Sequence, residues 1–162
     1  MAKNKEVKTN AMRILDKLKI PYEHHTYECD EFISGIQIAD KLELPHELVY
    51  KTLVTIGNSR NYYVFVIPIE REIDLKKAAR EVGEKSLAMI PVKEINAVTG
   101  YIRGGCTAIG MKKQYPVRIQ KEAQTLSKII VSGGRIGSQL ELRPEDLRRA
   151  ADAEFTDVCV DW

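Results

Sequence analysis

The sequence lacks most features that mark a secreted, membrane-bound or classical hydrolytic protein. Its three cysteines, Cys29, Cys106 and Cys159, are an odd number without CxxC spacing, which favours reduced thiols and a cytoplasmic location. No apolar run is long enough to span a bilayer, and no charged-then-apolar leader follows Met1. There is no G-x-S-x-G motif and no tellingly spaced pair of carboxylates, so a conventional hydrolase is hard to build.

A strong excess of charge of one sign is also missing. The formal net charge is +2 and the pI is near 8.4, which permits an RNA partner without demanding one, and no DNA partner is expected. What is present is an ordinary globular composition, 44% apolar and 30% charged over 162 residues. We therefore expect one domain spanning residues 1–162, with residues 1–10 polar and frayed.

Local patterns predict helices and strands in irregular alternation. The expected helices cover 11–18, 35–42 (opened by a Ser34–Gln37 capping box), 75–82 (between Asp74 and Gly83), 91–99 and a last one from Pro144. The expected strands cover 22–28, 48–56, 62–69, 86–90, 117–120, 128–131, 138–142 and 155–160. Because no regular βαβ rhythm is present, we predict an α+β fold with a mixed, barrel-like sheet surrounded by helices.

The strand over 48–56 carries a lysine in its apolar middle. Lys51 shares a strand face with Val49 and Leu53, because alternate residues point the same way. An ammonium there either reaches water or is held for a purpose. Composition and spacing alone favour a structural Lys51, since edge strands commonly carry a lysine against aggregation.

Two segments are rich in glycine. Residues 100–110 contain four glycines, and Ser132-Gly133-Gly134 is followed by Gly137. Neither segment is a P-loop, because no Gly-Lys-Ser/Thr follows. Glycines expose main-chain N–H and C=O groups, which can bind polar substrate atoms without any side chain.

Two other candidate sites are weaker. The adjacent His24 and His25 point to opposite faces of a strand and have no Cys, Asp or Glu at a convincing ligand spacing, so we predict neither a metal site nor a cofactor. Cys106 follows two glycines and could act as a nucleophile with His24, His25 or His46. A small residue in a tight loop explains Cys106 equally well.

Six segments of the sequence, taken together, indicate a protein family. In chain order they are His25-Thr26-Tyr27, Tyr50-Lys51-Thr52-Leu53, Leu75-Lys76-Lys77-Ala78-Ala79, residues 100–110, Ser132-Gly133-Gly134 with Gly137, and Glu154-Phe155-Thr156-Asp157. In this order they resemble the YbaK/EbsC family of free-standing aminoacyl-tRNA editing proteins, which is related to the insertion domain of bacterial prolyl-tRNA synthetase. The resemblance covers about residues 11–157.

The resemblance implies hydrolysis of a mischarged aminoacyl-tRNA, most characteristically Cys-tRNA(Pro), with Cys-tRNA(Cys) as a further substrate. Lys51 matches the family's essential lysine, and we expect it to position the 3′-terminal adenosine or its phosphate. The implied catalytic residues are Lys51, Gly104 and Ser132, and the implied substrate-binding residues are Tyr27, Gly105, Gly133 and Gly134. The pair Arg135-Ile136 departs from the family, which has a basic residue and then Arg before the glycine matching Gly137.

The implied chemistry needs no enzyme nucleophile, cofactor or metal, because an aminoacyl ester is already activated. The resemblance implies that in cysteine-specific members the thiol of the substrate itself attacks the ester carbonyl. The reference pKa of this thiol is about 8.5. Alternatives remain open: removal of alanine or another small residue from tRNA(Pro), a non-catalytic tRNA- or protein-binding regulator, and a Cys106 thiol hydrolase. The expected partners are the acceptor end of aminoacyl-tRNA and prolyl-tRNA synthetase, which would supply the choice of tRNA.

Overall fold

The computed structural model describes residues 8–28 and 33–161 of the chain. Its α-helices are α1 (Asn10–Lys17), α2 (Gly35–Lys41), α3 (Leu75–Val82), α4 (Ile95–Thr99) and α5 (Pro144–Ala151). Its strands are β1 (Glu23–Thr26), β2 (Tyr50–Gly57), β3 (Tyr62–Pro68), β4 (Leu87–Met89), β5 (Val117–Gln120), β6 (Ile129–Ser132), β7 (Ser138–Leu142) and β8 (Ala153–Thr156). Short 3-10 helices are η2 (His46–Leu48), η3 (Val92–Glu94) and η4 (Lys121–Thr125).

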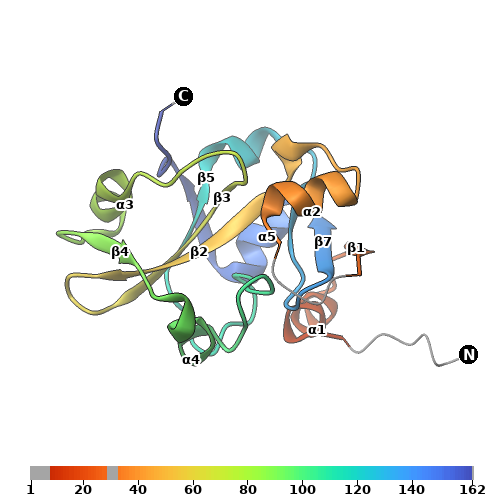
Figure 1. Ribbon diagram of the computed structural model, residues 1–162, viewed down its shortest axis with the longest axis horizontal. Coiled ribbons are helices and arrows are strands. Elements are labelled where there is room, and N and C mark those ends of the chain that lie inside the picture. The colour runs from red at the N-terminus through yellow and green to blue at the C-terminus, as the bar shows by residue number, and fades with distance from the viewer. Residues whose placement is uncertain (1–7, 29–32, 162) are drawn as a thin grey trace, which may run out of the picture.

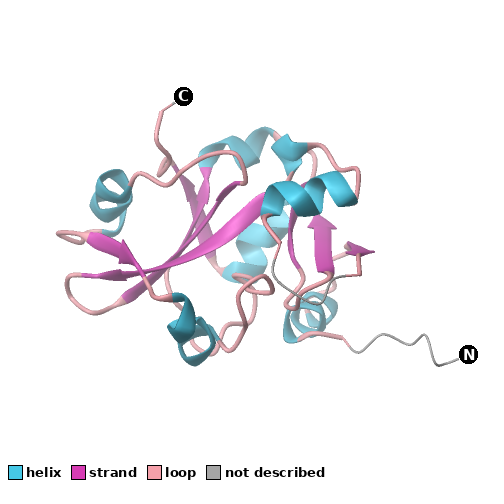
Figure 2. Ribbon diagram, in the orientation of Figure 1, coloured by secondary structure: helices cyan, strands magenta, loops and turns pink. Residues whose placement is uncertain are grey.

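The described strands form two open sheets (Figures 1 and 2). The larger has the order β4-β2-β3-β5-β8, and the smaller has the order β1-β7-β6. The β2–β3 hairpin is antiparallel, whereas β3 pairs with β5, and β5 with β8, in parallel. The predicted α+β class with mixed pairing is confirmed. The sheets do not form a closed barrel, because neither of them closes on itself in the described part of the chain.

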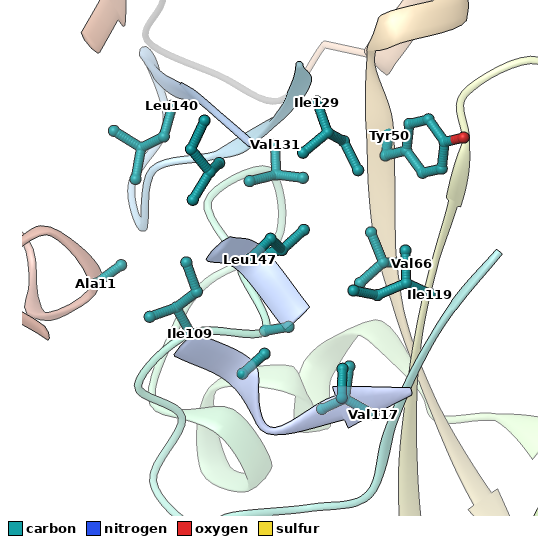
Figure 3. Packing of buried hydrophobic residues seen from close by; sticks show 14 of the residues in the cluster. Ala11, Tyr50, Val66, Ile109, Val117, Ile119, Ile129, Val131, Leu140 and Leu147 are labelled. Atoms are coloured by element: carbon teal, nitrogen blue, oxygen red, sulfur yellow. The ribbon is translucent and has the colours of Figure 1, made fainter. Parts of the chain in front are cut away.

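The two sheets meet around one apolar core (Figure 3). Val131 and Leu140 of the smaller sheet, Val66 and Ile119 of the larger and Leu147 of α5 are each at most 1% exposed and belong to one packed cluster. Burial of such side chains contributes roughly 1.5–3 kcal/mol each. The sheets also touch directly, because Val49, just before β2, forms a parallel bridge with Ile130 of β6.

Helices α2 and α3 have the N-terminal caps that the sequence predicts. The Ser34 hydroxyl accepts from the Gln37 N–H at 3.2 Å, and the Gln37 side chain accepts from the Ser34 N–H at 2.8 Å, which completes a capping box at α2. At α3 the Asp74 carboxylate accepts two main-chain N–H groups, and Gly83 ends the helix with φ of +78°.

Other boundaries differ from prediction. The last strand starts at Ala153, two residues before the predicted position, because Asp152 ends α5 in the left-handed region and the chain turns there. The predicted helix over 91–99 is η3 followed by α4, with Pro91 ahead of the first turn instead of inside it.

The start of the chain is ordered earlier than expected. Residues 1–7 of the predicted frayed segment lie outside the described residues, but Thr9 is the N-cap of α1 and Asn10 is its first residue. The buried residues of α1 are Ala11, Met12 and Leu15, and Leu18, which follows the helix as its C-cap, is 41% exposed. None of the helices in the described ranges could cross a membrane.

Candidate active site

A pocket of about 470 Å³ lies where the two sheets and α2 come together. This volume is in the range of small-molecule ligand sites. One wall is the first half of β2, and α2 lies beside it (Figure 1). Further lining residues come from the β4–α4 region, from the glycine-rich loop after α4 and from the smaller sheet: Met89, Ile90, Val92, Ile95, Arg103, Gly104, Cys106, Ser132 and Gln139.

The pocket runs along an open stretch of β2. Strand β4 pairs only with Thr55–Gly57 of β2, and the parallel bridge to β6 lies at Val49. In an antiparallel pair the main-chain groups of successive residues point to alternate sides. The main chain of Val49 bonds Ile69, toward β3, whereas the Val54 oxygen accepts from Ile90 on the other side. The main-chain groups of Thr52 therefore point into the gap between β4 and β6, which is the pocket.

Lys51 lines one end of the pocket and is partly buried. Its ammonium donates to the Ile69 oxygen at 3.4 Å, which is long for a hydrogen bond. Burial lowers the pKa of Lys51 below the usual lysine value, against smaller opposite effects of Cys159 and Glu72. Within the described residues no carboxylate lies within 4.0 Å of the ammonium. A partly buried cation with one weak neutral contact is well suited to bind a ligand oxygen.

Ser132 reaches the same pocket from β6. It stands two residues after Ile130, just as Lys51 stands two residues after Val49, so the Val49–Ile130 bridge brings the two side chains to one place. The Ser132 hydroxyl accepts from the Gly134 N–H at 3.4 Å. The hydroxyl hydrogen remains available for a ligand acceptor.

The glycine-rich loop after α4 forms a third wall. Gly104 lines the pocket with φ of +88°, a conformation that other residues rarely adopt. The neighbouring Gly105 is buried instead of facing the pocket. A Cβ on Gly105 would lie 2.6 Å from the Arg135 Cα, so Gly105 allows the two glycine-rich segments to pack against each other.

Cys106 lines the pocket but is poorly suited to act as a nucleophile. Burial raises the pKa of the Cys106 thiol to about 11, and the thiol points to the Thr99 hydroxyl at 4.0 Å. No histidine is among the described residues that line the pocket. His24 bonds the Ser138 hydroxyl at 2.7 Å, and His46 bonds Asp40 and Glu70. The structure therefore offers Cys106 no histidine as a base.

The structure brings together Lys51, Gly104 and Ser132, the three residues predicted to be catalytic. The four predicted substrate-binding residues are not among the described residues that line the pocket. Tyr27 follows β1, and its N–H donates to the Gly137 oxygen at 3.0 Å. Gly133 is buried, and a Cβ there would lie 2.2 Å from the Ser138 hydroxyl, while Gly134 packs against Thr9 and Gly105 against Arg135. These glycines serve close packing behind the pocket wall.

A separate polar cluster lies on the smaller sheet. Potential ligand atoms of Glu23, His25 and Glu141 lie within 4.8 Å of one another. The Glu141 carboxylate pairs with His25 at 2.8 Å and with Lys128 at 2.8 Å. His25 therefore has a carboxylate neighbour that spacing along the sequence does not reveal, because β1 pairs with β7, more than a hundred residues later in the chain. None of these four residues lines the pocket.

Sequence reasoning also missed pocket residues that have no motif. Arg103, Gln139 and the main chain of Thr52 face the pocket only because of where β4 ends and how β7 lies beside β6. The only local signal is for Arg103, which lies inside the glycine-rich segment.

Comparison with known protein families identifies the class of protein to which this fold and pocket belong. The model of the aminoacyl-tRNA editing domain matches residues 35–150. The chain belongs to this family, which confirms the family resemblance and the predicted editing class of enzyme, with aminoacyl-tRNA as substrate.

Particular relatives extend the match over almost the whole chain. A protein of Enterococcus faecalis, named "Putative Cys-tRNA(Pro)/Cys-tRNA(Cys) deacylase EbsC", is 44% identical over 160 residues, 98% of each chain. Two crystal structures share the fold at 19% identity. One, titled "a putative trans-editing enzyme for prolyl tRNA synthetase", has a TM-score of 0.79 over 96% of this chain and 100% of its own. The other, of a hypothetical protein (APE2540), has a TM-score of 0.83 over 93% of this chain and 99% of its own.

Proposed function

We propose that the protein hydrolyses the ester bond of Cys-tRNA(Pro), and that it also accepts Cys-tRNA(Cys). The name of the 44% identical relative supports this choice of substrate. The observation that carries the proposal is the meeting of Lys51, Gly104 and Ser132 in one pocket, from three separate parts of the chain. Prolyl-tRNA synthetase as a partner and a cytoplasmic location are parts of the same proposal.

Each wall of the pocket has a role in holding the substrate. Lys51 would bind an oxygen of the terminal adenosine or its phosphate, since an ammonium with only a weak internal contact loses little by turning to a ligand. The exposed main chain at Gly104 and Thr52 would bind the substrate's ammonium and ester carbonyl. Ser132 would donate its hydroxyl hydrogen to the acyl group.

The bond-breaking step uses the thiol of the substrate. Its sulfur attacks the carbonyl carbon of the cysteinyl ester, the bond to the ribose oxygen breaks, and the 3′ hydroxyl of the tRNA leaves with the proton. Water then opens the resulting cyclic thioester and releases cysteine. The pocket supplies orientation and a positive charge that favours the thiolate, so no protein side chain needs to be acylated.

A deacylation panel tests the proposal. The parent protein is incubated with Cys-, Ser-, Ala- and Pro-tRNA(Pro) and with Cys-tRNA(Cys), in the presence and absence of prolyl-tRNA synthetase. We expect the cysteinyl esters to be cleaved at least tenfold faster than the seryl ester, whose side chain has nearly the same shape but no thiol. Equal rates for cysteinyl and seryl esters would refute the thiol mechanism, and tight binding without turnover of any ester would favour a regulator.

A further inference from the structure

The first residues of α1 contact both glycine-rich segments beside the pocket. Thr9, the N-cap of α1, donates its hydroxyl to the Gly133 oxygen at 2.6 Å. Asn10 donates its side-chain amide to the Gly110 oxygen at 2.8 Å. The partners are 124 and 100 positions apart in the chain, and both α1 residues precede the part matched by the family model. Such contacts fix the segments to a helix that does not itself reach the pocket.

The contact of Thr9 bears on Ser132 through one peptide unit. The Gly133 oxygen and the Gly134 N–H belong to the same planar trans peptide, in which C=O and N–H point in opposite directions. The oxygen accepts from the Thr9 hydroxyl at 2.6 Å, and the N–H points to the Ser132 hydroxyl oxygen at 3.4 Å, a contact as long as that between Lys51 and the Ile69 oxygen. Gly134 has φ of +105°, and a Cβ on it would lie 3.0 Å from the Thr9 Cβ. The peptide is therefore held between Thr9 on one side and Ser132 on the other.

We propose that Thr9 is a positioning residue for Ser132. The hydroxyl of Thr9 orients the peptide between Gly133 and Gly134, and the N–H of that peptide orients the Ser132 hydroxyl toward the pocket. A peptide flanked by two glycines rotates at little steric cost, so it needs an external contact to keep one orientation. The inference rests on the proposed function for its catalytic consequence, but not for its structural one.

Capping of α1 and positioning of Ser132 use different atoms of the same hydroxyl group. The Thr9 oxygen accepts from the Met12 N–H at 3.2 Å, which caps the helix, whereas its hydrogen goes to the Gly133 oxygen. Aspartate is as good an N-cap as threonine but has no hydrogen to donate when it is ionised. Serine keeps both functions. The two roles can therefore be separated by substitution.

The experiment compares Thr9→Asp, Thr9→Ser and the parent in deacylation of Cys-tRNA(Pro) and in amide hydrogen exchange. For Thr9→Asp we expect kcat to fall about tenfold with KM within about twofold of the parent, because a misplaced Ser132 affects reaction geometry more than binding. We also expect exchange of the Gly134 amide to become about tenfold faster relative to other loop amides. Thr9→Ser should keep kcat within about twofold.

Lys8→Ala is the matched control, since Lys8 pairs with Asp16 on the exposed side of α1 and has no contact with either glycine-rich segment in the interactions of the described residues. It should leave kcat and Gly134 exchange unchanged. If Thr9→Asp does not fold, Thr9→Ala takes its place in the comparison. Parental kcat and parental Gly134 exchange in the variant that lacks the donor would overturn the inference, as would an equal loss in Thr9→Ser.

Failure of this inference and failure of the proposed function give different results. A parent protein that leaves Cys-tRNA(Pro) intact refutes the function, and the exchange rate of Gly134 still reports whether Thr9 holds the peptide. Conversely, an active parent with an indifferent Thr9 refutes only the positioning role.

Discussion

The pocket contains Lys51, and the polar cluster on the smaller sheet contains Glu141; these two charged residues have different kinds of partner. Glu141 has one partner for each carboxylate oxygen, His25 and Lys128, both at 2.8 Å. Lys51 has a carbonyl oxygen at 3.4 Å and a cavity beside it. A charge whose partners all belong to the protein stabilises the fold. A charge with a weak internal partner beside a cavity is available to a ligand.

The protein destabilises the charged form of Lys51 but stabilises the charged form of Glu141. Burial lowers the pKa of Lys51, which shows that the protein makes the charged form of this lysine less stable than it is in water. Lys128, and to a smaller extent His25, lower the pKa of Glu141, so the protein stabilises its charged form. Glu141 with His25 and Lys128 thus forms a structural cluster, whereas Lys51 marks the site that binds the substrate in our proposal.

The largest expected effect is on Lys51. Lys51→Ala should lower kcat/KM for Cys-tRNA(Pro) deacylation about 100-fold, or about 2.7 kcal/mol of transition-state stabilisation. Its thermal unfolding should change little, because the ammonium has no strong internal partner to lose. Single-turnover deacylation and thermal melts measure the two effects. The matched control is Lys76→Ala, which removes an exposed lysine from α3. A folded Lys51→Ala protein with parental activity would show that Lys51 does not bind the substrate.

An intermediate effect is expected at Glu141, on stability and not on activity. Glu141→Gln keeps the shape of the side chain but removes the charge that His25 and Lys128 share, at a cost of about 1 kcal/mol in the free energy of unfolding. A carboxylate with a lowered pKa contributes stability above its unfolded pKa of about 4.3 and loses it as pH falls through the folded pKa. Urea unfolding should therefore show a deficit at pH 7 that shrinks in acid, with an unchanged deacylation rate. Loss of activity would tie the cluster to the pocket.

The smallest effect is expected at Cys106, although it lies in the pocket. With a pKa of about 11, about one thiol in ten thousand is ionised at pH 7, which is too little for an efficient nucleophile. Cys106→Ser should keep kcat/KM within about threefold of the parent, and iodoacetamide should label Cys106 slowly at neutral pH and faster as pH rises. Trapping of an acyl group on Cys106 during turnover would contradict this account and restore the thiol hydrolase.

Local physics made much of the fold predictable. The capping box at Ser34 and the Asp74 cap of α3 act over three or four residues, so the sequence alone specifies them. Strands β5 and β7 have the predicted bounds, because short β-branched or alternating runs between turn residues leave few other choices. The residue range of an element follows from neighbours in the chain.

Pairing between distant segments was not predictable in the same way. The parallel pairing of β3 with β5, and of β5 with β8, cannot be read from the residues of any one of these strands. The proximity of Glu141 to His25 depends on the β1–β7 register. At the site, resemblance to a family predicted Lys51, Gly104 and Ser132, whereas Tyr27 matched a motif without lining the pocket in this chain.

The bridge between Val49 and Ile130 limits the ways in which the size of the pocket can change during evolution. Strands slide past each other only in whole-residue steps, and one step turns every side chain to the opposite face. A one-residue insertion ahead of Lys51 or Ser132 would thus reverse a wall instead of widening it. Adaptation of this scaffold to a bulkier or smaller acyl group must proceed by exchanging wall side chains, with the backbone frame left in place.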